Sequence, residues 1–356
     1  MSSPPLFAGR SMSRGPVVGR YRIDGNLIPP IDEDHALSQD VAAQVRSSGL
    51  SAIKLTVGGS GNEDKQKTLE TLRIFERSLA LNPDLFLKVG SIDDISAAAT
   101  SGRLGVIFSF EAAEMLEGEL ENIDFFRGLG VLVMGLSYNV QTPFASGVNA
   151  PESTGLTRLG REAVMRMNAL GITVDLSHSD DRSGMDAIGM STRPILISHA
   201  GCAAVHQHPR NKSDRLLRAL AEKGGVVGIY ELSFLVPYPR QPALEDYLAH
   251  LTHALNVCGE DHVAIGTDGY IVPFDTSADS LTMWAQENER RRKAGVAAPG
   301  EGPLPFVIGL NGPHRYDIIA AALRRRGYPR RVVEKVMGAN LLRVFDETWR
   351  ASVSGT

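Results

Sequence analysis

The chain has 356 residues, of which 43% are hydrophobic, and a formal net charge of −4 at pH 7. This length allows one large domain or two ordinary ones, and the charge gives no electrostatic reason to expect nucleic acid or an anionic membrane surface. Two cysteines exclude a disulfide framework. No apolar run approaches the ~20 residues that span a bilayer, and residues 1–15 lack the apolar segment of a signal peptide. We therefore expect a cytoplasmic protein.

Short β-branched runs alternate with amphipathic stretches along the chain, which is typical of βα units and a parallel sheet. The strand candidates are near-continuously apolar, as strands buried on both faces are. In chain order they are Val17–Ile28, Ala52–Val57, Leu104–Phe110, Val131–Tyr138, Ile172–Leu176, Ile195–Ile197, Val226–Tyr230 and Val263–Ile265. The helix candidates include Leu37–Ser48, Lys65–Leu81, Leu216–Lys223, Tyr316–Arg326 and Val332–Phe345.

Eight strands with intervening helices in a chain of this length predict an α/β fold, a (β/α)8 TIM barrel. An open doubly wound sheet is the alternative, but no Gly-x-Gly-x-x-Gly follows the first strand. We interpret residues 1–356 as a single barrel domain that ends in C-terminal helices over residues 314–345. The segment 271–310 is polar and rich in Pro and Gly, and it follows the eighth strand directly. This position predicts an insertion at the barrel mouth, as a lid or an interface.

Four chemically reactive side chains follow predicted strands. Glu111 comes after the third strand and His178 after the fifth, while His199 and Asp268 come after the sixth and eighth. In a barrel the reacting groups lie at the C-terminal ends of different strands. Two neutral imidazoles and a carboxylate are a common set of ligands for catalytic zinc. A nearby Asp could then take a proton from the bound water, or bind a second metal.

Each of these residues also has a structural interpretation. A single His after a strand is more often a core or capping residue than a ligand, and Glu111 could cap the next helix. Asp268 could form an Asx turn with Gly269, and Asp24 could anchor the first strand. Arg210, just beyond the His199 loop, could grip a substrate carboxylate or form a loop salt bridge.

Several longer motifs occur in order along the chain. They are Gly155–Glu162, Met167–Gly171, Asp175–His178, His208–Asn211 and Gly338–Val344. In these motifs the chain resembles the membrane dipeptidase (renal dipeptidase) family of the amidohydrolase superfamily. The resemblance extends from about Gly105 to Gly228 and again from His314 to Val344. It implies a barrel of the metal-dependent hydrolase type and a zinc enzyme that cleaves dipeptides and related amides with a free carboxylate.

The resemblance also implies a role for each candidate residue. Glu111 would be the carboxylate that bridges two metal ions, and His178 and His199 would be ligands of the second metal. Asp268 would be the carboxylate that handles the proton. Arg210 corresponds to the arginine that receives the carboxylate of the substrate.

The chain departs from the family pattern at the first metal. In the family the first strand ends Asp-Gly-His-Asn-Asp, and the His and the final Asp hold the first zinc. Asn26 and Ile28 stand in these two places. Asn binds zinc poorly and Ile cannot bind it. We therefore expect one zinc ion per chain, with no metal as the alternative, and Asn26 as a substrate contact.

Two further departures concern the pocket. The fourth strand ends with Tyr138 where the family has a histidine that helps polarise the scissile carbonyl. A tyrosine hydroxyl can donate one hydrogen bond but stays neutral near pH 7, so we assign Tyr138 to both catalysis and substrate binding. The insertion over residues 271–310 has no clear counterpart in the family.

Three functions are compatible with this sequence. We favour a dipeptidase-like zinc hydrolase with a mononuclear site, which cleaves an amide bond in a small substrate that carries a carboxylate. The alternative is an isomerase, tautomerase or lyase, with or without metal, in which Tyr138 and Asp268 are the acid/base pair. The third is an inactive binding protein, which the retention of the other site residues disfavours. The expected partner is a small molecule, without nucleic acid or membrane, and the sequence also allows a homodimer.

Overall fold

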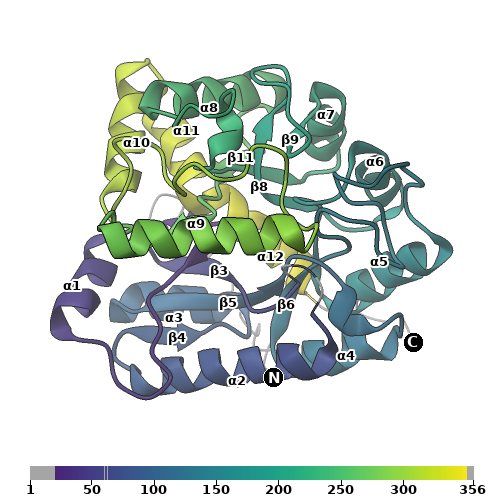
Figure 1. Cartoon of the computed structure of the whole chain (residues 1–356), viewed down its shortest axis with the longest axis horizontal. Helices are drawn as coiled ribbons and strands as arrows, with labels where there is room; N and C mark the ends of the chain where they lie inside the picture. The colour runs from purple at the N-terminus through teal and green to yellow at the C-terminus, as the bar shows by residue number, and fades with distance from the viewer. Residues whose placement is uncertain (1–20, 60, 62, 351–356) are drawn as a thin grey trace, which may run out of the picture.

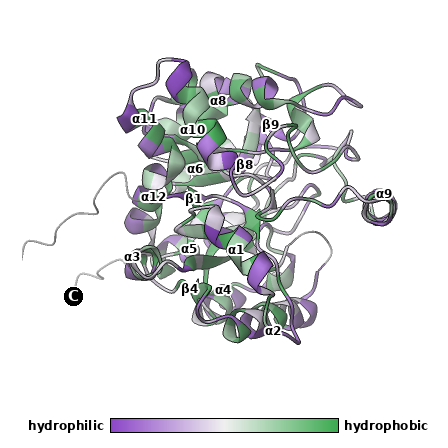
Figure 2. Cartoon of the chain, turned by 90° about the vertical axis from the view of Figure 1, so that its left-hand side faces the viewer, coloured by the Kyte–Doolittle hydropathy of each residue, from purple (hydrophilic) through white to green (hydrophobic). Residues whose placement is uncertain are grey.

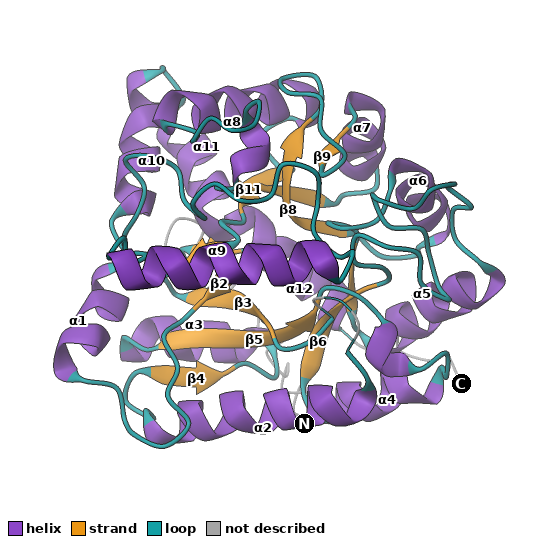
Figure 3. Cartoon of the chain, viewed as in Figure 1, coloured by secondary structure: helices purple, strands orange, loops and turns teal. Residues whose placement is uncertain are grey.

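A closed barrel of parallel strands forms the centre of the molecule. The computed structural model describes residues 21–59, 61 and 63–350. Within them the barrel strands pair in the order β1 (Ile23–Asp24), β3 (Ala52–Thr56), β5 (Leu104–Phe110), β6 (Val131–Gly135), β7 (Thr173–Asp175), β8 (Leu196–Cys202), β10 (Val226–Ile229) and β11 (Val263–Ile265). The N–H of Gly25, directly after β1, donates to the carbonyl of Ile265 at 2.9 Å and closes the sheet. The (β/α)8 prediction is confirmed (Figure 3), and the open sheet is wrong.

Helices alternate with these strands and cover the outside of the barrel (Figure 1). They are α1 (Gln39–Ser47), α2 (Lys65–Leu81), α3 (Ile92–Ser101), α4 (Glu121–Gly128), α5 (Arg158–Leu170), α6 (Asp181–Met190), α7 (Asp214–Glu222) and α8 (Leu244–Cys258). Side chains fix where several of them begin. Asp64, Thr157, Asp180 and Ser213 each accept a hydrogen bond from the backbone N–H three residues on, which satisfies a donor that the first turn leaves free.

The first strand differs from its prediction. Within the described residues it covers only Ile23–Asp24, and residues 17–20 lie outside them. The chain then turns at Gly25-Asn26, and β2 (Leu27–Ile28) pairs with β12 (Gly269–Tyr270) in a separate two-stranded sheet. Asn26 therefore lies in the turn between two short strands, at the mouth of the barrel.

Two other short strands escaped prediction. β4 (Phe86–Lys88) pairs with the start of β5, and β9 (Asn211–Lys212) pairs with the end of β8. Runs of two or three residues are too short to show a periodic pattern. Between the main elements lie two 3-10 turns, η1 (Glu114–Leu116) and η2 (Ser233–Leu235).

The C-terminal segment closes the opposite end of the barrel. After α10 (Arg315–Arg325), the predicted helix Val332–Phe345 is divided into α11 (Arg330–Glu334), a π-turn η3 (Lys335–Ala339) and α12 (Asn340–Trp349). The division lies at Gly338, where a Cβ would stand 2.7 Å from the carbonyl oxygen of Tyr21, so the turn packs directly on the backbone before β1. The apolar face of α12 then packs against the first residues of the barrel strands.

The insertion over residues 271–310 lies at the mouth. Its charged run forms a helix, α9 (Ala278–Lys293), which was not predicted because it has no apolar face: Asn288 is its one buried residue. Figure 2 shows α9 and α12 on opposite sides of the barrel. No helix in the described part of the chain is long and apolar enough to cross a membrane.

Two positions near the carbonyl oxygen of Ser198 in β8 have no room for a side chain: Gly228 in β10 and Gly266, directly after β11. A Cβ on Gly266 would lie 1.7 Å from the carbonyl oxygen of Ser198. We expect Gly266→Ala to lower the free energy of unfolding by more than about 3 kcal/mol, measured by chemical denaturation. The control is Gly189→Ala in α6, where nothing lies within 4 Å of the new Cβ, and where stability should change by no more than about 1 kcal/mol. Equal effects of the two substitutions would contradict this explanation.

Candidate metal centre and active site

Glu111, His178 and His199 come together at the mouth of the barrel. Glu111 is the first residue after β5, and His178 lies three residues after β7. His199 was predicted to follow its strand, but it lies inside β8, which extends to Cys202. Its side chain still reaches the mouth, because β8 continues into the loop region and pairs there with β9.

The three side chains present their ligand atoms to one point. The Nε2 atoms of His178 and His199 are 2.9 Å apart. Glu111 Oε2 lies 3.6 Å from His178 Nε2, and Glu111 Oε1 lies 3.9 Å from His199 Nε2. In the described part of the chain this is the one group of three such residues whose ligand atoms all lie within 4.8 Å of one another. Zinc bonds of roughly 2 Å place the ligands of one ion at similar spacings.

Other hydrogen bonds leave the Nε2 atoms available. His178 Nδ1 lies 2.9 Å from Asn139 Oδ1, and His199 Nδ1 lies 2.8 Å from Ser198 Oγ. Burial, followed by the charge of Arg210, holds the pKa of both histidines well below its ordinary value. Both imidazoles are therefore neutral at pH 7, which is the form that binds a metal.

A buried carboxylate orients the loops that carry the histidines. Asp175, the last residue of β7, accepts hydrogen bonds from Ser177 Oγ at 2.6 Å and from Ser198 Oγ at 2.5 Å. It also accepts the backbone N–H groups of these two serines, each at 3.1 Å. Asp175 belongs to the predicted Asp175–His178 motif, but its role in orienting the histidines was not predicted. Such supporting contacts fix the orientation of metal ligands.

Asp268 faces the same point from the other side. Its Oδ2 lies 3.8 Å from His199 Nε2, and its backbone φ is 55°, a left-handed conformation that Asp tolerates better than most residues. Burial, and then the charge of Glu111, raises the pKa of Asp268 to about 7. The carboxyl group is thus close to the ligand set and near the balance between its two protonation states.

Asn26 also lies in the centre, but both ends of its amide are engaged. Its Nδ2 donates to Glu111 Oε1 at 2.8 Å and to Asp268 Oδ1 at 2.7 Å. Its Oδ1 accepts from Lys54 Nζ at 2.9 Å. Ile28, in the other place of the family's first-metal pair, is 39% exposed and offers no ligand atom. These residues do not fit a first metal ion.

Tyr138 stacks on the ring of His178 and contacts the insertion. Its ring lies 4.1 Å from the ring of His178, at an angle of 21°. Its hydroxyl oxygen accepts a hydrogen bond from Arg291 of α9 at 3.0 Å, and Arg291 forms an ion pair with Glu301. Burial raises the pKa of Tyr138, so the phenol stays neutral. Arg291 and Glu301 were missed because their segment gave no structural signal.

Arg210 is 2% exposed, and its guanidinium is only partly engaged. Its Nη1 lies 2.8 Å from His178 Nδ1 and 3.5 Å from Asn139 Oδ1. Since Nδ1 carries its hydrogen when Nε2 is free for a metal, Nη1 then donates to Asn139 alone, and Nε and Nη2 are buried without a hydrogen-bond partner. None of the ion pairs in the described residues includes Arg210, so the loop salt bridge considered for it is absent there. A buried, unpaired donor pair of this kind costs free energy unless a ligand satisfies it.

Several of these residues, though not His178 or His199, line one cavity of about 340 Å³. The barrel contributes Asn26, Glu111, Tyr138, Arg210 and Asp268, and the insertion contributes several residues from α9 and from the segment that follows it. Tyr270, Trp284 and Glu287 line this cavity and also a neighbouring groove of about 700 Å³ beneath α9.

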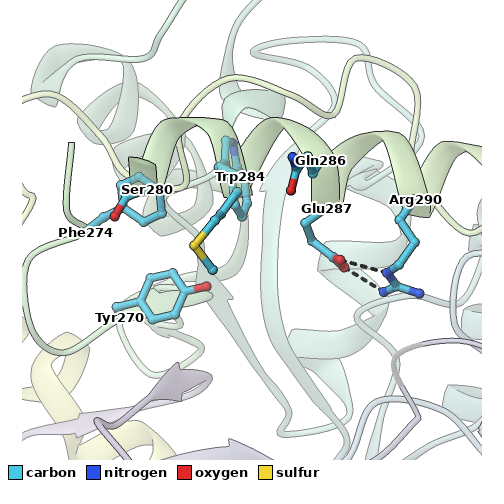
Figure 4. Close-up of a pocket in the computed structure, with 8 residues that line it drawn as sticks. Tyr270, Phe274, Ser280, Trp284, Gln286, Glu287 and Arg290 are labelled. Carbon is cyan, nitrogen blue, oxygen red and sulfur yellow. Dashed lines mark hydrogen bonds and ion pairs between the residues drawn. The ribbon is translucent and has the colours of Figure 1, made fainter. Parts of the chain in front are cut away.

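Three aromatic side chains, and Met283, form the apolar part of the groove, and the other lining residues are polar or charged. Figure 4 shows the rings of Tyr270, Phe274 and Trp284 along it, with the Glu287–Arg290 ion pair at one end. The Phe274 and Trp284 rings meet edge to face at 5.6 Å. The metal centre therefore opens through Tyr270 and Trp284 onto an apolar surface.

Comparison with known sequences shows the family to which this chain belongs. The family model described as membrane dipeptidase (peptidase family M19) matches residues 33–276. The chain belongs to the membrane dipeptidase family. An uncharacterised Klebsiella pneumoniae protein, described as encoded in the pqqA 5′ region, is 30% identical over 270 residues, which is 73% of this chain and 88% of that protein. The dipeptidase tcpJ of Claviceps purpurea is 27% identical over 283 residues, and the match spans 79% of this chain but only 59% of tcpJ.

Solved structures agree with this assignment. An amidohydrolase from Pseudomonas aeruginosa shares 28% identity with a TM-score of 0.77, over 92% of this chain and 96% of that one. A metallo peptidase from Rhodobacter sphaeroides, liganded with a phosphinate mimic of the dipeptide L-Ala-D-Ala, has the same fold at 20% identity, with a TM-score of 0.73 over 92% and 99% of the two chains. The chain is a dipeptidase-like metallohydrolase, and the resemblance inferred from its motifs is confirmed.

Glu114, beside the metal centre, provides a test of the electrostatics. Both of its carboxylate oxygens are buried without a hydrogen-bond partner among the described residues. Burial, together with the charges of Glu63 and Glu111, raises its pKa to about 7. Because the folded pKa lies above the unfolded one, the stability from this group is present below pH 4.5 and is lost as the pH rises through 7.

Glu114→Gln should therefore match the wild type at pH 4.5 and be more stable by about 1–3 kcal/mol at pH 8. Urea unfolding at the two pH values measures this. Glu119→Gln, at an exposed position nearby, should behave like the wild type at both. A Glu114→Gln effect that is independent of pH would show that the buried charge is not its cause.

Proposed function

We propose that this chain hydrolyses the amide bond of a small substrate that carries a free carboxylate, with one zinc ion held by Glu111, His178 and His199. One observation carries the proposal. Two neutral imidazoles and a carboxylate converge on one point, and the carboxylate, Glu111, lines the same cavity as the buried guanidinium of Arg210, two of whose donors are unpaired. A metal set with an open position and a carboxylate receptor are the two parts that such a reaction needs.

The protein supplies the proton transfer. When bound, zinc would lower the pKa of its water and polarise the scissile carbonyl. Asp268 lies next to the ligand set, so its carboxylate can take the proton of the attacking water and deliver it to the leaving nitrogen. The Asn26 hydrogen bond to Asp268 Oδ1 leaves Oδ2 free for this task.

Tyr138 would stabilise the carbonyl oxygen as it gains charge. Its hydroxyl oxygen accepts a hydrogen bond from Arg291, so its own hydrogen is free to point into the cavity. A donor placed where negative charge develops is worth more than one that only binds the ground state. The Arg291 guanidinium strengthens that donor, because a cation on the phenol oxygen makes the O–H more acidic.

Arg210 would bind the carboxylate. The unpartnered Nε and Nη2 atoms form one edge of the guanidinium fork, which matches the two oxygens of a carboxylate. The opposite end of the substrate would then extend past Tyr270 and Trp284 towards the aromatic groove. A dipeptide or N-acyl amino acid with an aromatic or long apolar group on its amine side fits this arrangement.

Removal of a ligand tests the metal. We expect the purified wild type to hold about one zinc per chain, and His199→Ala to lose the zinc and all measurable hydrolysis. Asp268→Asn should keep the zinc but lower kcat by about 10²–10⁴-fold. Elemental analysis and dipeptide hydrolysis measure both.

The control is His253→Ala, because His253 pairs with Asp214 on the outside of the barrel; it should keep zinc and activity. Hydrolysis that persists in His199→Ala would refute the zinc mechanism. A wild type that takes up no zinc would favour the metal-free acid/base alternative with Asp268 and Tyr138.

Arg210→Met tests the carboxylate receptor. Loss of charge-assisted hydrogen bonds of about 1.5–3 kcal/mol should raise KM for a carboxylate substrate by about 10–100-fold. The same substrate with its carboxylate capped as an amide should be a poor substrate for the wild type. Arg210→Met should have the same KM for this capped substrate as the wild type has. Zinc content must stay at the wild-type level, because Arg210 contacts His178. An equal rise in KM for both substrates would exclude this role.

A further inference from the structure

The place of the family's first metal is filled by protein hydrogen bonds. Asn26 uses both hydrogens of its amide nitrogen on carboxylates, and its oxygen accepts a hydrogen bond from Lys54 Nζ at 2.9 Å. The single hydroxyl hydrogen of Thr56 is shared between Glu111 Oε1 at 2.9 Å and Asn26 Oδ1 at 3.1 Å. Only one orientation of an amide satisfies two carboxylates on one side and an ammonium on the other. The arrangement is thus fully specified and has no free ligand atom.

Lys54 provides the positive charge in this place. It belongs to β3, points into the barrel and is 0% exposed. Besides Asn26 Oδ1, its Nζ lies 3.5 Å from Asp175 Oδ2. A buried ammonium costs free energy unless hydrogen-bond acceptors and nearby negative charge offset its loss of hydration. Here one carboxylate is in direct contact, and Asn26 connects the ammonium to Glu111 and Asp268.

We propose that the Lys54 ammonium takes the place of the first metal ion of the family's binuclear centre, and that it excludes a second metal from this chain. The inference rests on the proposed mononuclear function. Formal charges agree with it. A His, an Asp and a dication carry a net charge of about +1 together, and Asn26, Ile28 and the Lys54 ammonium carry the same.

Lys54 acts on the reaction through Asn26 and is a positioning residue. The ammonium holds Asn26 Oδ1, so that Nδ2 points to Glu111 and Asp268. The proton-handling carboxylate and the metal-binding carboxylate are thereby kept at fixed positions on either side of one amide.

A direct chemical role for Lys54 does not fit the geometry. Its side chain does not line the cavity that contains Arg210 and Asp268, and it is enclosed on all sides. A substrate in the cavity therefore cannot reach Nζ as a nucleophile or base. A purely structural ion pair with Asp175 is the remaining alternative, and it predicts no effect on the number of metal ions.

The test counts metal ions after the family's ligands are restored. Each protein is equilibrated with zinc, dialysed and analysed for zinc per chain. We expect about one zinc in the wild type and about one in Asn26→His/Ile28→Asp, because the ammonium still fills the site. The triple variant that adds Lys54→Met should bind about two, since methionine is nearly isosteric and uncharged.

Lys212 provides the matched control. It is also a fully buried lysine, but its Nζ donates to the carbonyl oxygen of Ser179 at 2.6 Å and has no contact with Asn26. Asn26→His/Ile28→Asp with Lys212→Met should stay at about one zinc. Two zinc ions in the double variant, or one in the Lys54 triple variant, would overturn the proposal.

The single variant Lys54→Met provides a second readout that does not depend on the folding of the triple variant. It should keep one zinc and bind substrate with a similar KM, while kcat falls by at least tenfold because Asp268 is no longer held. Unchanged kcat would also overturn the proposal. A wild type without zinc would instead contradict the proposed function, so the two failures are distinguishable.

Discussion

The closure of the barrel at Asp24 is the constraint on which the site depends. This fully buried carboxylate accepts the backbone N–H groups of Asn26 at 2.9 Å and Thr267 at 3.0 Å, and also the hydroxyls of Thr267 and Tyr316. It therefore joins the exit of the first strand to the exit of the last. Asp268 N then donates to Asn26 O at 2.7 Å. Because both loops are fixed at this seam, residues 242 positions apart in sequence share a hydrogen bond at the mouth.

Charge balance explains why so many ionisable groups can lie inside this barrel. Among the described residues, Lys54 faces Asp175 and Asn26, and Arg315 faces Glu231. Arg210 differs from these two cations, because two of its donors are unsatisfied. Buried unsatisfied donors are rare in folded proteins, and this deficit is the observation on which the proposed carboxylate receptor rests.

The sequence predicted the features that depend on short-range patterns and on motifs. Strands such as Leu104–Phe110 were found from their apolar runs, and Glu111, His178 and His199 from their place after strands and from the motifs around them. Lys54 was not found, because a lone lysine in a strand gives no sign of whether it points inward. Arg291 was not found either, since its helix has no apolar face and its contact with Tyr138 spans 153 positions. Both depend on long-range packing.

Two of the three departures from the family share one physical arrangement. At Asn26 and at Tyr138, a neutral hydrogen-bonding group faces the cavity, and a cation of the protein stands behind it: Lys54 behind the amide and Arg291 behind the phenol. A metal ion or an imidazolium delivers charge directly, whereas a neutral group backed by a cation delivers a polarised hydrogen bond at a fixed position. A fixed donor costs no reorganisation during the reaction.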